Sequence, residues 1–297
     1  MKFWQSGMFL PPERLTDLAR ASEAAGFDGV MVSDHIAYPE TLSSPYPYTP
    51  DGKPPFQRET PWPDPWIAIG AMAAVTERLR FGTHIFIAPA RPLLTVAKQV
   101  ATAAVLSDNR VVLGAGAGWM REEFDLMGQP YARRGARFDE MLAVLKTLWT
   151  GEVTEHHGEF YDFAPLSIAP TPSQPVPVWI GGDSEAAVSR AVRHDGWVGN
   201  LYQPDEAFEK AEVVVKALRN AGREAGDGFD LVLSVYALND LDLFRRLEDA
   251  GVTALVTAPW MLAEPTWDAQ RDAIERFGDE VIAAMGDQGP SGPRSGE

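Results

Sequence analysis

The strongest constraint on the fold is a repeated unit made of a helix end, a glycine and an apolar strand. It occurs as SEAAGFDGVMVSD at residues 22–34 and as LEDAGVTALVTAP at residues 247–259. Apolar runs and amphipathic segments alternate along the rest of the chain, which predicts eight strands, each followed by a helix. Repeating strand–helix units require parallel pairing with right-handed crossovers. Eight of them favour an α/β fold of the closed (β/α)8 TIM-barrel type over an open doubly wound sheet.

Two segments interrupt this alternation. Residues 36–63, after the second strand, are so rich in proline that we expect an inserted loop serving as a lid or binding loop. Residues 152–170 form a small polar insertion, for which we expect a hairpin. We assign residues 1–285 to one barrel domain and residues 286–297, rich in Gly, Pro and Ser, to a disordered tail. The predicted strands are 3–9, 28–33, 79–87, 110–115, 176–180, 197–200, 231–237 and 253–257, and the predicted helices are 13–25, 65–76, 93–106, 134–150, 184–193, 205–224, 242–250 and 267–285.

The composition excludes several classes of function. Lys and Arg total 26 against 42 Asp and Glu, and a net charge of −16 repels the phosphate backbone of nucleic acids. The absence of cysteine excludes disulfides and thiolate chemistry. There is no signal-peptide pattern and no apolar run of the roughly 20 residues that a membrane span needs. We therefore expect a soluble cytoplasmic protein that binds neither nucleic acid nor a membrane.

Polar residues follow several of the predicted strands, and in a parallel barrel the active site lies at these carboxyl ends. Asp34 and His35 follow the second strand, and His84 lies within the third. For a single Asp-His pair the simpler interpretation is a turn with a helix cap. The recurrence of such residues at other strand ends favours a site.

Two glycine-rich stretches also follow strands. GAGAGWMREEF, residues 114–124, lacks the third glycine of a dinucleotide fingerprint because Trp119 stands there, so we favour a pocket wall at this position. GGDSEAA, residues 181–187, opens a helix and offers free backbone N–H groups to a phosphate. The alternative for the second stretch is an ordinary turn with Asp183 or Ser184 as the N-cap.

The remaining histidines do not indicate a metal site. His156 and His157 are adjacent, so they point apart on a strand and do not share a ligand. His194 ends a predicted helix, where we expect a solvated ring favoured by the helix dipole. The sequence has no zinc-binding pattern, and we predict no metal.

Five segments together resemble the luciferase-like monooxygenase superfamily, and within it the branch of oxidoreductases that use the deazaflavin coenzyme F420. The resemblance runs from about residue 26 to residue 200, in family order. The segments are GFDGVMVSDH, DPWIAIGAMAAVTERLRFGTHIFIAP, PLLTVAKQVATAAVLSDNRVVLGAGAGWMREEF, RGARFDEMLAVLKTLWTG and VPVWIGGDSEAAVSRA.

This resemblance implies roles for individual residues. His35 matches the position of a proton donor in some deazaflavin dehydrogenases, and Asp34 is placed beside the polar edge of the cofactor ring. The His84–Ile85 bond falls where the family has a non-proline cis peptide that backs the ring. The implied cofactor-binding residues are Asp34, His84, Ile85, Ala117, Gly118, Gly181, Gly182 and Ser184, the last three holding the phosphate.

The chain departs from the sugar-phosphate dehydrogenases of that branch. They have a glutamate at the position of Trp119, and a tryptophan at that of Pro39, four residues after the site histidine. These differences argue against glucose-6-phosphate and for an apolar or aromatic substrate under the proline-rich loop. We assign Tyr38, Trp66, Trp119 and Glu123 to the substrate pocket, with Trp62 nearby.

The resulting hypothesis is an oxidoreductase that transfers hydride between F420 and a small organic substrate, with His35 moving the proton. An FMN-dependent two-component monooxygenase using oxygen is the alternative, and the net charge of −16 favours it because F420 has a polyglutamate tail. Lys53, Arg58 and Arg91 are the candidate partners of that tail. A minor alternative is a non-catalytic ligand-binding barrel. The expected partners are a small-molecule substrate, a possible separate cofactor-reducing enzyme and a second copy in a homodimer.

Overall fold

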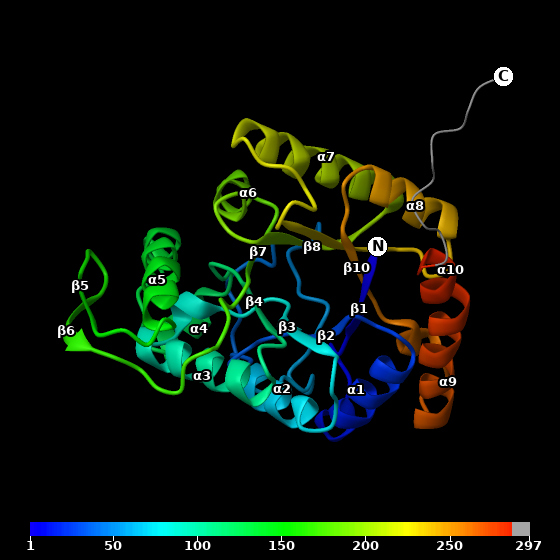
Figure 1. Cartoon of the computed structure of the whole chain (residues 1–297), viewed down its shortest axis with the longest axis horizontal. Helices are drawn as coiled ribbons and strands as arrows, with labels where there is room; N and C mark the ends of the chain where they lie inside the picture. The colour runs from blue at the N-terminus through cyan, green and yellow to red at the C-terminus, as the bar shows by residue number, and fades with distance from the viewer. Residues whose placement is uncertain (287–297) are drawn as a thin grey trace.

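The computed structural model, which describes residues 1–286, confirms the (β/α)8 barrel. Eight parallel strands close in the order β1-β10-β9-β8-β7-β4-β3-β2, and helices surround them (Figure 1). The barrel strands are β1 (Lys2–Ser6), β2 (Gly29–Val32), β3 (Arg80–Thr83), β4 (Val111–Ala115), β7 (Val178–Gly181), β8 (Gly196–Tyr202), β9 (Asp230–Val235) and β10 (Ala254–Thr257). The main helices are α1 (Leu15–Ala24), α2 (Pro65–Ala73), α3 (Leu93–Leu106), α4 (Arg121–Leu126), α5 (Arg134–Leu148), α6 (Glu185–Ala191), α7 (Pro204–Asn220), α8 (Leu241–Asp249), α9 (Trp267–Phe277) and α10 (Ala283–Gly286).

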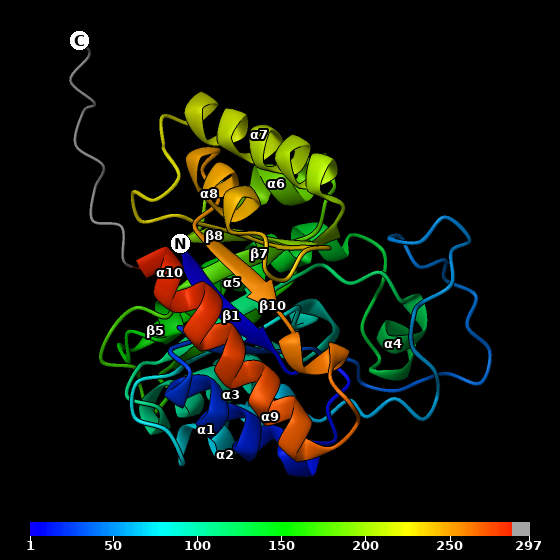
Figure 2. The same ribbon diagram turned by 90° about the vertical axis from the view of Figure 1, so that its right-hand side faces the viewer.

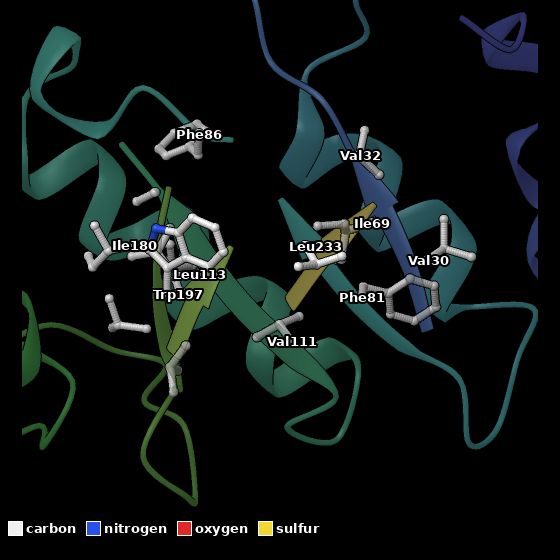
Figure 3. Close-up of a cluster of buried hydrophobic side chains, with 14 of the residues drawn as sticks. Val30, Val32, Ile69, Phe81, Phe86, Val111, Leu113, Ile180, Trp197 and Leu233 are labelled. Carbon is white, nitrogen blue, oxygen red and sulfur yellow. The ribbon is translucent and has the colours of Figure 1, made fainter. Parts of the chain in front are cut away.

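Alternating side chains of each strand build two separate cores. One set faces the helices and includes Val30, Phe81 and Leu113, all fully buried (Figure 3). The other set fills the barrel interior, where Trp4 packs edge-on against Trp179 with ring centroids 5.2 Å apart. The period of two residues along a strand produces this division. The interior is thus a packed core over most of its length.

Glycines in the strands make room for the large interior side chains. A Cβ added at Gly29 would lie 2.3 Å from the Trp4 ring, and one added at Gly82 would lie 2.6 Å from the Met31 sulfur. No real Cβ tolerates such contacts, so glycine at these two positions is a packing requirement. Large and small residues on neighbouring strands therefore complement each other.

Both predicted interruptions are present. Residues 36–63 contain no helix or strand, and the insertion forms a hairpin of β5 (Thr154–His157) and β6 (Asp162–Leu166) outside the ring of helices. Glu140 of α5 holds this hairpin by accepting hydrogen bonds from the backbone of Phe160 and Tyr161 and from His156. His157 instead contacts Asp162, so the two adjacent histidines do point apart, as expected.

Several local predictions differ from the structure, among them the first strand, predicted as 3–9, which ends at Ser6. The predicted strand 79–87 ends at Thr83 in the structure, although His84 N still donates to Val32 O and Phe86 forms an isolated bridge with Ala115. Helix α4 was not predicted, since six residues are too few for a periodic pattern. The predicted helix 267–285 contains a π-helical turn at Gly278–Ile282.

The end of the chain differs slightly from its prediction. The tail was expected to begin at residue 286, but Gly286 ends α10, and residues 287–297 lie outside the described part. Within residues 1–286, no helix has both the length and the apolar character needed to cross a bilayer.

We expect His194 to make the stability of the fold depend on pH. Burial, reinforced by the Lys146 ammonium, lowers the pKa of His194 from 6.5 to about 4, so the expectation of a solvated, dipole-favoured ring is wrong. The unfolded chain therefore binds a proton between these pH values that the folded chain does not. We expect the free energy of unfolding to decrease as the pH falls from 6.5 towards 4, and His194→Gln to reduce this loss in urea titrations.

His157→Gln is the matched control for this prediction. The hydrogen bond to Asp162 raises the pKa of exposed His157, so its contribution has the opposite sign. A pH dependence that is unchanged by His194→Gln would contradict the assignment.

Candidate functional site

The segments that carry the predicted site residues gather at one end of the barrel. Figure 2 shows the loop 36–63 and helix α4 together beyond the carboxyl ends of the strands. In a barrel of parallel strands, every loop that follows a strand opens onto this end. This end is the mouth of the barrel.

Asp34 is buried at the end of β2 and is bound by two groups. Its carboxylate forms a bidentate ion pair with Arg91, at 2.7 and 2.8 Å, and accepts a hydrogen bond from Ile87 N at 2.9 Å. Burial raises the pKa of Asp34, while the guanidinium and the amide oppose this shift. The pair joins the end of β2 to the segment after β3. With both partners buried and occupied, Arg91 is not available to a cofactor tail.

His35 lies in the mouth and is surrounded by aromatic rings. Its ring centroid is 4.6 Å from that of Phe56, 5.1 Å from Trp62 and 6.1 Å from Trp119. Its Nδ1 lies 3.1 Å from Glu123 Oε1. The described contacts give Nε2 no protein partner, so this nitrogen is the one open to a ligand.

Glu123 is not a wall of the substrate pocket, which corrects its predicted role. The residue is only 1% exposed and lies behind His35, where its Oε1 also accepts a hydrogen bond from Ile36 N at 2.6 Å. Both contacts join α4 to the end of β2. Sequence reasoning could not pair these residues because 88 positions separate them.

The His84–Ile85 peptide bond is cis, as the resemblance implies. Burial lowers the pKa of His84, so its ring is neutral near pH 7 and its Nε2–H donates to Gly199 O at 2.9 Å. The Ile85 side chain lies over two glycines of neighbouring strands. A Cβ at Gly181 would be 2.4 Å from Ile85 Cδ1, and one at Gly116 would be 2.9 Å from Ile85 Cγ2.

The other glycines with a predicted role in cofactor binding lie at the mouth. Gly118 has φ +82°, and a Cβ there would lie 2.6 Å from Ile87 Cγ2, while Gly182 has φ +115°. These values favour glycine. Ala117, Gly118, Gly181 and Gly182 are all partly exposed. Both stretches therefore have partly exposed backbone at the mouth, although Ile85 covers one side of Gly181 and Ile87 one side of Gly118.

Ser184 is exposed and forms the N-cap of α6, with its Oγ accepting from Ala187 N at 3.2 Å. The predicted N-cap alternative is therefore met, and phosphate binding by this turn stays a prediction. The carboxylate of Asp183 would oppose an anion, but Lys210 lies 3.3 Å from it and Tyr202 OH donates to it at 2.6 Å.

Trp66 belongs to the core, which corrects its assignment to the substrate pocket. It is 5% exposed and packs against Phe86, because it lies on the face of α2 that covers the barrel. The Tyr38 ring lies near that of Phe56. The Trp119 ring lies edge-on to that of Tyr46 in the loop, with ring centroids 5.1 Å apart. The loop thus supplies aromatic residues, Tyr46 and Phe56, that were not predicted.

The loop is tied to the mouth by α4. Glu122 Oε1 accepts from the backbone N–H groups of Ser43 and Ser44, at 2.7 and 3.0 Å. Tyr46 reaches across to Asn200 of β8, whose hydrogen bond partly offsets the rise that burial causes in the pKa of Tyr46. In this position the loop covers one side of the mouth.

The cations at the mouth are few and mostly engaged. Lys53 is exposed and Arg58 pairs with Glu40. Arg134, which was not predicted, donates from Nε to Gly118 O at 2.8 Å and stacks on the Tyr131 ring at 3.8 Å. No carboxylate pairs with Arg134 among the described residues. Arg134 stands in the run ARRGARF, where no sequence pattern distinguishes it from Arg133 and Arg137.

Known proteins resemble this chain over most of its length. The family model described as luciferase-like monooxygenase matches residues 5–279. An uncharacterised protein of Mycobacterium tuberculosis is 40% identical over 275 residues, covering 90% of this chain and 94% of the relative. An F420-dependent glucose-6-phosphate dehydrogenase of Nakamurella multipartita is 31% identical over 246 residues, covering 80% of this chain and 67% of the relative.

Solved structures share the fold at lower identity. An F420-dependent secondary alcohol dehydrogenase in complex with an F420-acetone adduct has a TM-score of 0.74 at 15% identity, covering 95% of this chain and 98% of that one. The FMN complex of the oxygenating constituent of 3,6-diketocamphane monooxygenase from Pseudomonas putida has a TM-score of 0.62 at 17% identity, covering 84% and 71%.

The buried ion pair at the mouth yields a stability prediction. Arg91→Ala leaves Asp34 as a buried carboxylate without its partner, so we expect the free energy of unfolding to fall by about 3–5 kcal/mol in urea titrations. Arg58→Ala is the control, because the Arg58–Glu40 pair is exposed and worth roughly 0–1 kcal/mol. Equal small losses for both variants would show that the buried pair does not stabilise the fold.

Proposed function

Since the chain belongs to the luciferase-like monooxygenase family, we propose that it transfers hydride between coenzyme F420 and a small apolar or aromatic organic substrate at the barrel mouth. The observation that carries this proposal is the placement of His35. Its imidazole lies among aromatic rings at the mouth with Nε2 open, at the position where some F420 relatives hold a proton donor.

The residues at the mouth fit a flat, anionic cofactor. Ile85 packs on Gly116 and Gly181, while Gly118 and Gly182 are partly exposed and carry no side chain of their own. A planar ring can therefore lie close to the backbone at these two positions. The unpaired guanidinium of Arg134 lies next to Gly118 and suits a phosphate or carboxylate of the cofactor. We retain Gly182 and Ser184 as partners of the phosphate.

The chain contributes orientation, exclusion of water and a proton relay, while bound F420 supplies the hydride acceptor or donor. Asp34 and Arg91 hold the ends of the second and third βα units together. Phe56 and Trp62 of the loop cover His35 and keep water away from it. His35 Nε2 takes a proton when the substrate is oxidised and donates one when it is reduced.

The surroundings of His35 favour an uncharged substrate. The side chains in contact with its ring are Phe56, Trp62, Trp119 and Glu123, and none of them is a cation. A sugar phosphate would need positive charge here. Trp119 also occupies the position at which the sugar-phosphate dehydrogenases have a glutamate. We therefore propose an apolar or aromatic substrate.

The second candidate is an FMN-dependent monooxygenase. The observation in its favour is the scarcity of free cations at the mouth, since Arg58 and Arg91 already pair with carboxylates. FMN carries only a single phosphate, and the one guanidinium of Arg134 would be enough to bind it.

Cofactor titration decides between the two. Tryptophan fluorescence of the purified protein, which has nine tryptophans, is followed as F420 or FMN is added. We expect F420 to bind more tightly. The opposite preference would support the monooxygenase, and binding of neither would support the non-catalytic barrel.

His35→Ala tests the proton relay. With an identified substrate, we expect kcat to fall by about 10²- to 10⁴-fold, the usual contribution of general acid–base catalysis, with the Kd of the cofactor changed less than about threefold. His157→Ala is the control, because this histidine is exposed on the hairpin. Unchanged turnover in His35→Ala would remove the role assigned to this residue.

A further inference from the structure

Glu123 has a buried carboxylate, and its side-chain hydrogen bonds are made to the segment that carries His35. Its Oε1 accepts from Ile36 N at 2.6 Å and lies 3.1 Å from His35 Nδ1, and the residue is 1% exposed. Burying a carboxylate is unfavourable unless hydrogen bonds compensate for the lost water. The hydrogen bonds from Ile36 N and from His35 therefore offset part of the free energy that burying the Glu123 carboxylate costs.

The geometry assigns the proton on His35. An ionised carboxylate only accepts hydrogen bonds, so the ring nitrogen that faces Glu123 must carry a hydrogen. In the neutral imidazole that nitrogen is Nδ1, which leaves the lone pair on Nε2. Nε2 is also the nitrogen without a protein partner. The carboxylate therefore selects the form of His35 that can act as a base towards the mouth.

We propose that Glu123 is a positioning residue, which keeps the Nδ1–H form of His35 and stabilises its imidazolium. This inference rests on the proposed role of His35. If the substrate is oxidised, its proton would move to His35 Nε2, and bound F420 would supply the acceptor for the hydride. Nδ1 keeps its hydrogen, and the positive charge on the ring lies against Glu123. Substrate reduction reverses both transfers.

The surroundings strengthen the effect of this single carboxylate. Phe56, Trp62 and Trp119 exclude water from the ring, and an ionic contact is stronger in such a medium. The other charged groups near the ring are already engaged. Asp34 is paired with Arg91, and Glu122 holds the backbone of the loop. Glu123 is thus the carboxylate available to His35.

The first measurement is the tautomer of His35, read from the ¹⁵N shifts of its ring in protein with labelled histidine, both cofactor-free and saturated with F420. His35→Ala identifies the signal among the five histidines. We expect Nδ1–H in the parent, a smaller Nδ1–H fraction in Glu123→Gln, and the smallest in Glu123→Leu. Glutamine keeps the size and an acceptor but not the charge, whereas leucine removes the acceptor.

Glu122→Gln is the matched control. It makes the same change of charge one residue away, on a side chain that contacts the loop and not His35, so the tautomer should stay as in the parent. If Glu123→Leu fails to fold by circular dichroism, the comparison of Glu123→Gln with Glu122→Gln carries the test. An Nδ1–H fraction unchanged in both Glu123 variants, or in the one that folds, overturns the proposal.

The second measurement is a double-mutant cycle in turnover. We expect Glu123→Leu to lower kcat roughly tenfold or more with little change in KM, and to have no further effect when His35→Ala is already present. Additive losses in the double variant overturn the catalytic part of the proposal. Because the tautomer is observed without cofactor, an absence of F420 binding would defeat the proposed function and leave the Glu123–His35 result standing.

Discussion

The bidentate pair of Asp34 with Arg91 links the two βα units on which the site depends. Strands β2 and β3 are neighbours in the barrel, and one backbone hydrogen bond, from His84 N to Val32 O, extends their pairing past the end of β3. Beyond that point, the Asp34 carboxylate binds the guanidinium of Arg91 and the amide of Ile87, and so carries the connection past the cis bond. His35 follows Asp34 directly, and Ile85 precedes Ile87 by two residues. This buried ion pair therefore helps to fix the position of the His35 imidazole relative to Ile85.

Helix α4 also holds the segment that follows β2. Two consecutive glutamates of this six-residue helix have different tasks, since Glu122 binds the loop backbone and Glu123 binds His35. Helical geometry turns adjacent side chains by about 100°, so neighbouring residues serve different surfaces. One short helix thus fixes both the cover of the mouth and the ring beneath it.

The periodic features of the fold are predictable from the sequence, and the long-range contacts are not. The barrel, helix 93–106, the hairpin and the loop each leave a local signal in the chain, and the structure confirms them. The pairing of Asp34 with Arg91 joins residues 57 positions apart, and no local pattern reports it. Trp66 shows the same limit, because an aromatic residue beside a loop looks the same in sequence whether its helix turns it towards a ligand or towards the core.

Distant relatives share the barrel fold of this chain, although most of their side chains differ. A TM-score of 0.74 at 15% identity means that the barrel survives almost complete replacement of its side chains. Function depends on the residues at the ends of the strands and not on the fold itself. In this chain those residues surround His35 with aromatic rings and leave little free positive charge, which is why the proposed substrate is apolar.

The contact of Ile85 with two glycines has an evolutionary consequence. Its side chain occupies the space that a Cβ at Gly116 or Gly181 would need, within 2.9 and 2.4 Å. A side chain added at either glycine therefore forces Ile85 to shift, and a smaller residue at position 85 would leave space against both glycines. The effects of substitutions at the three positions are thus expected to depend on one another.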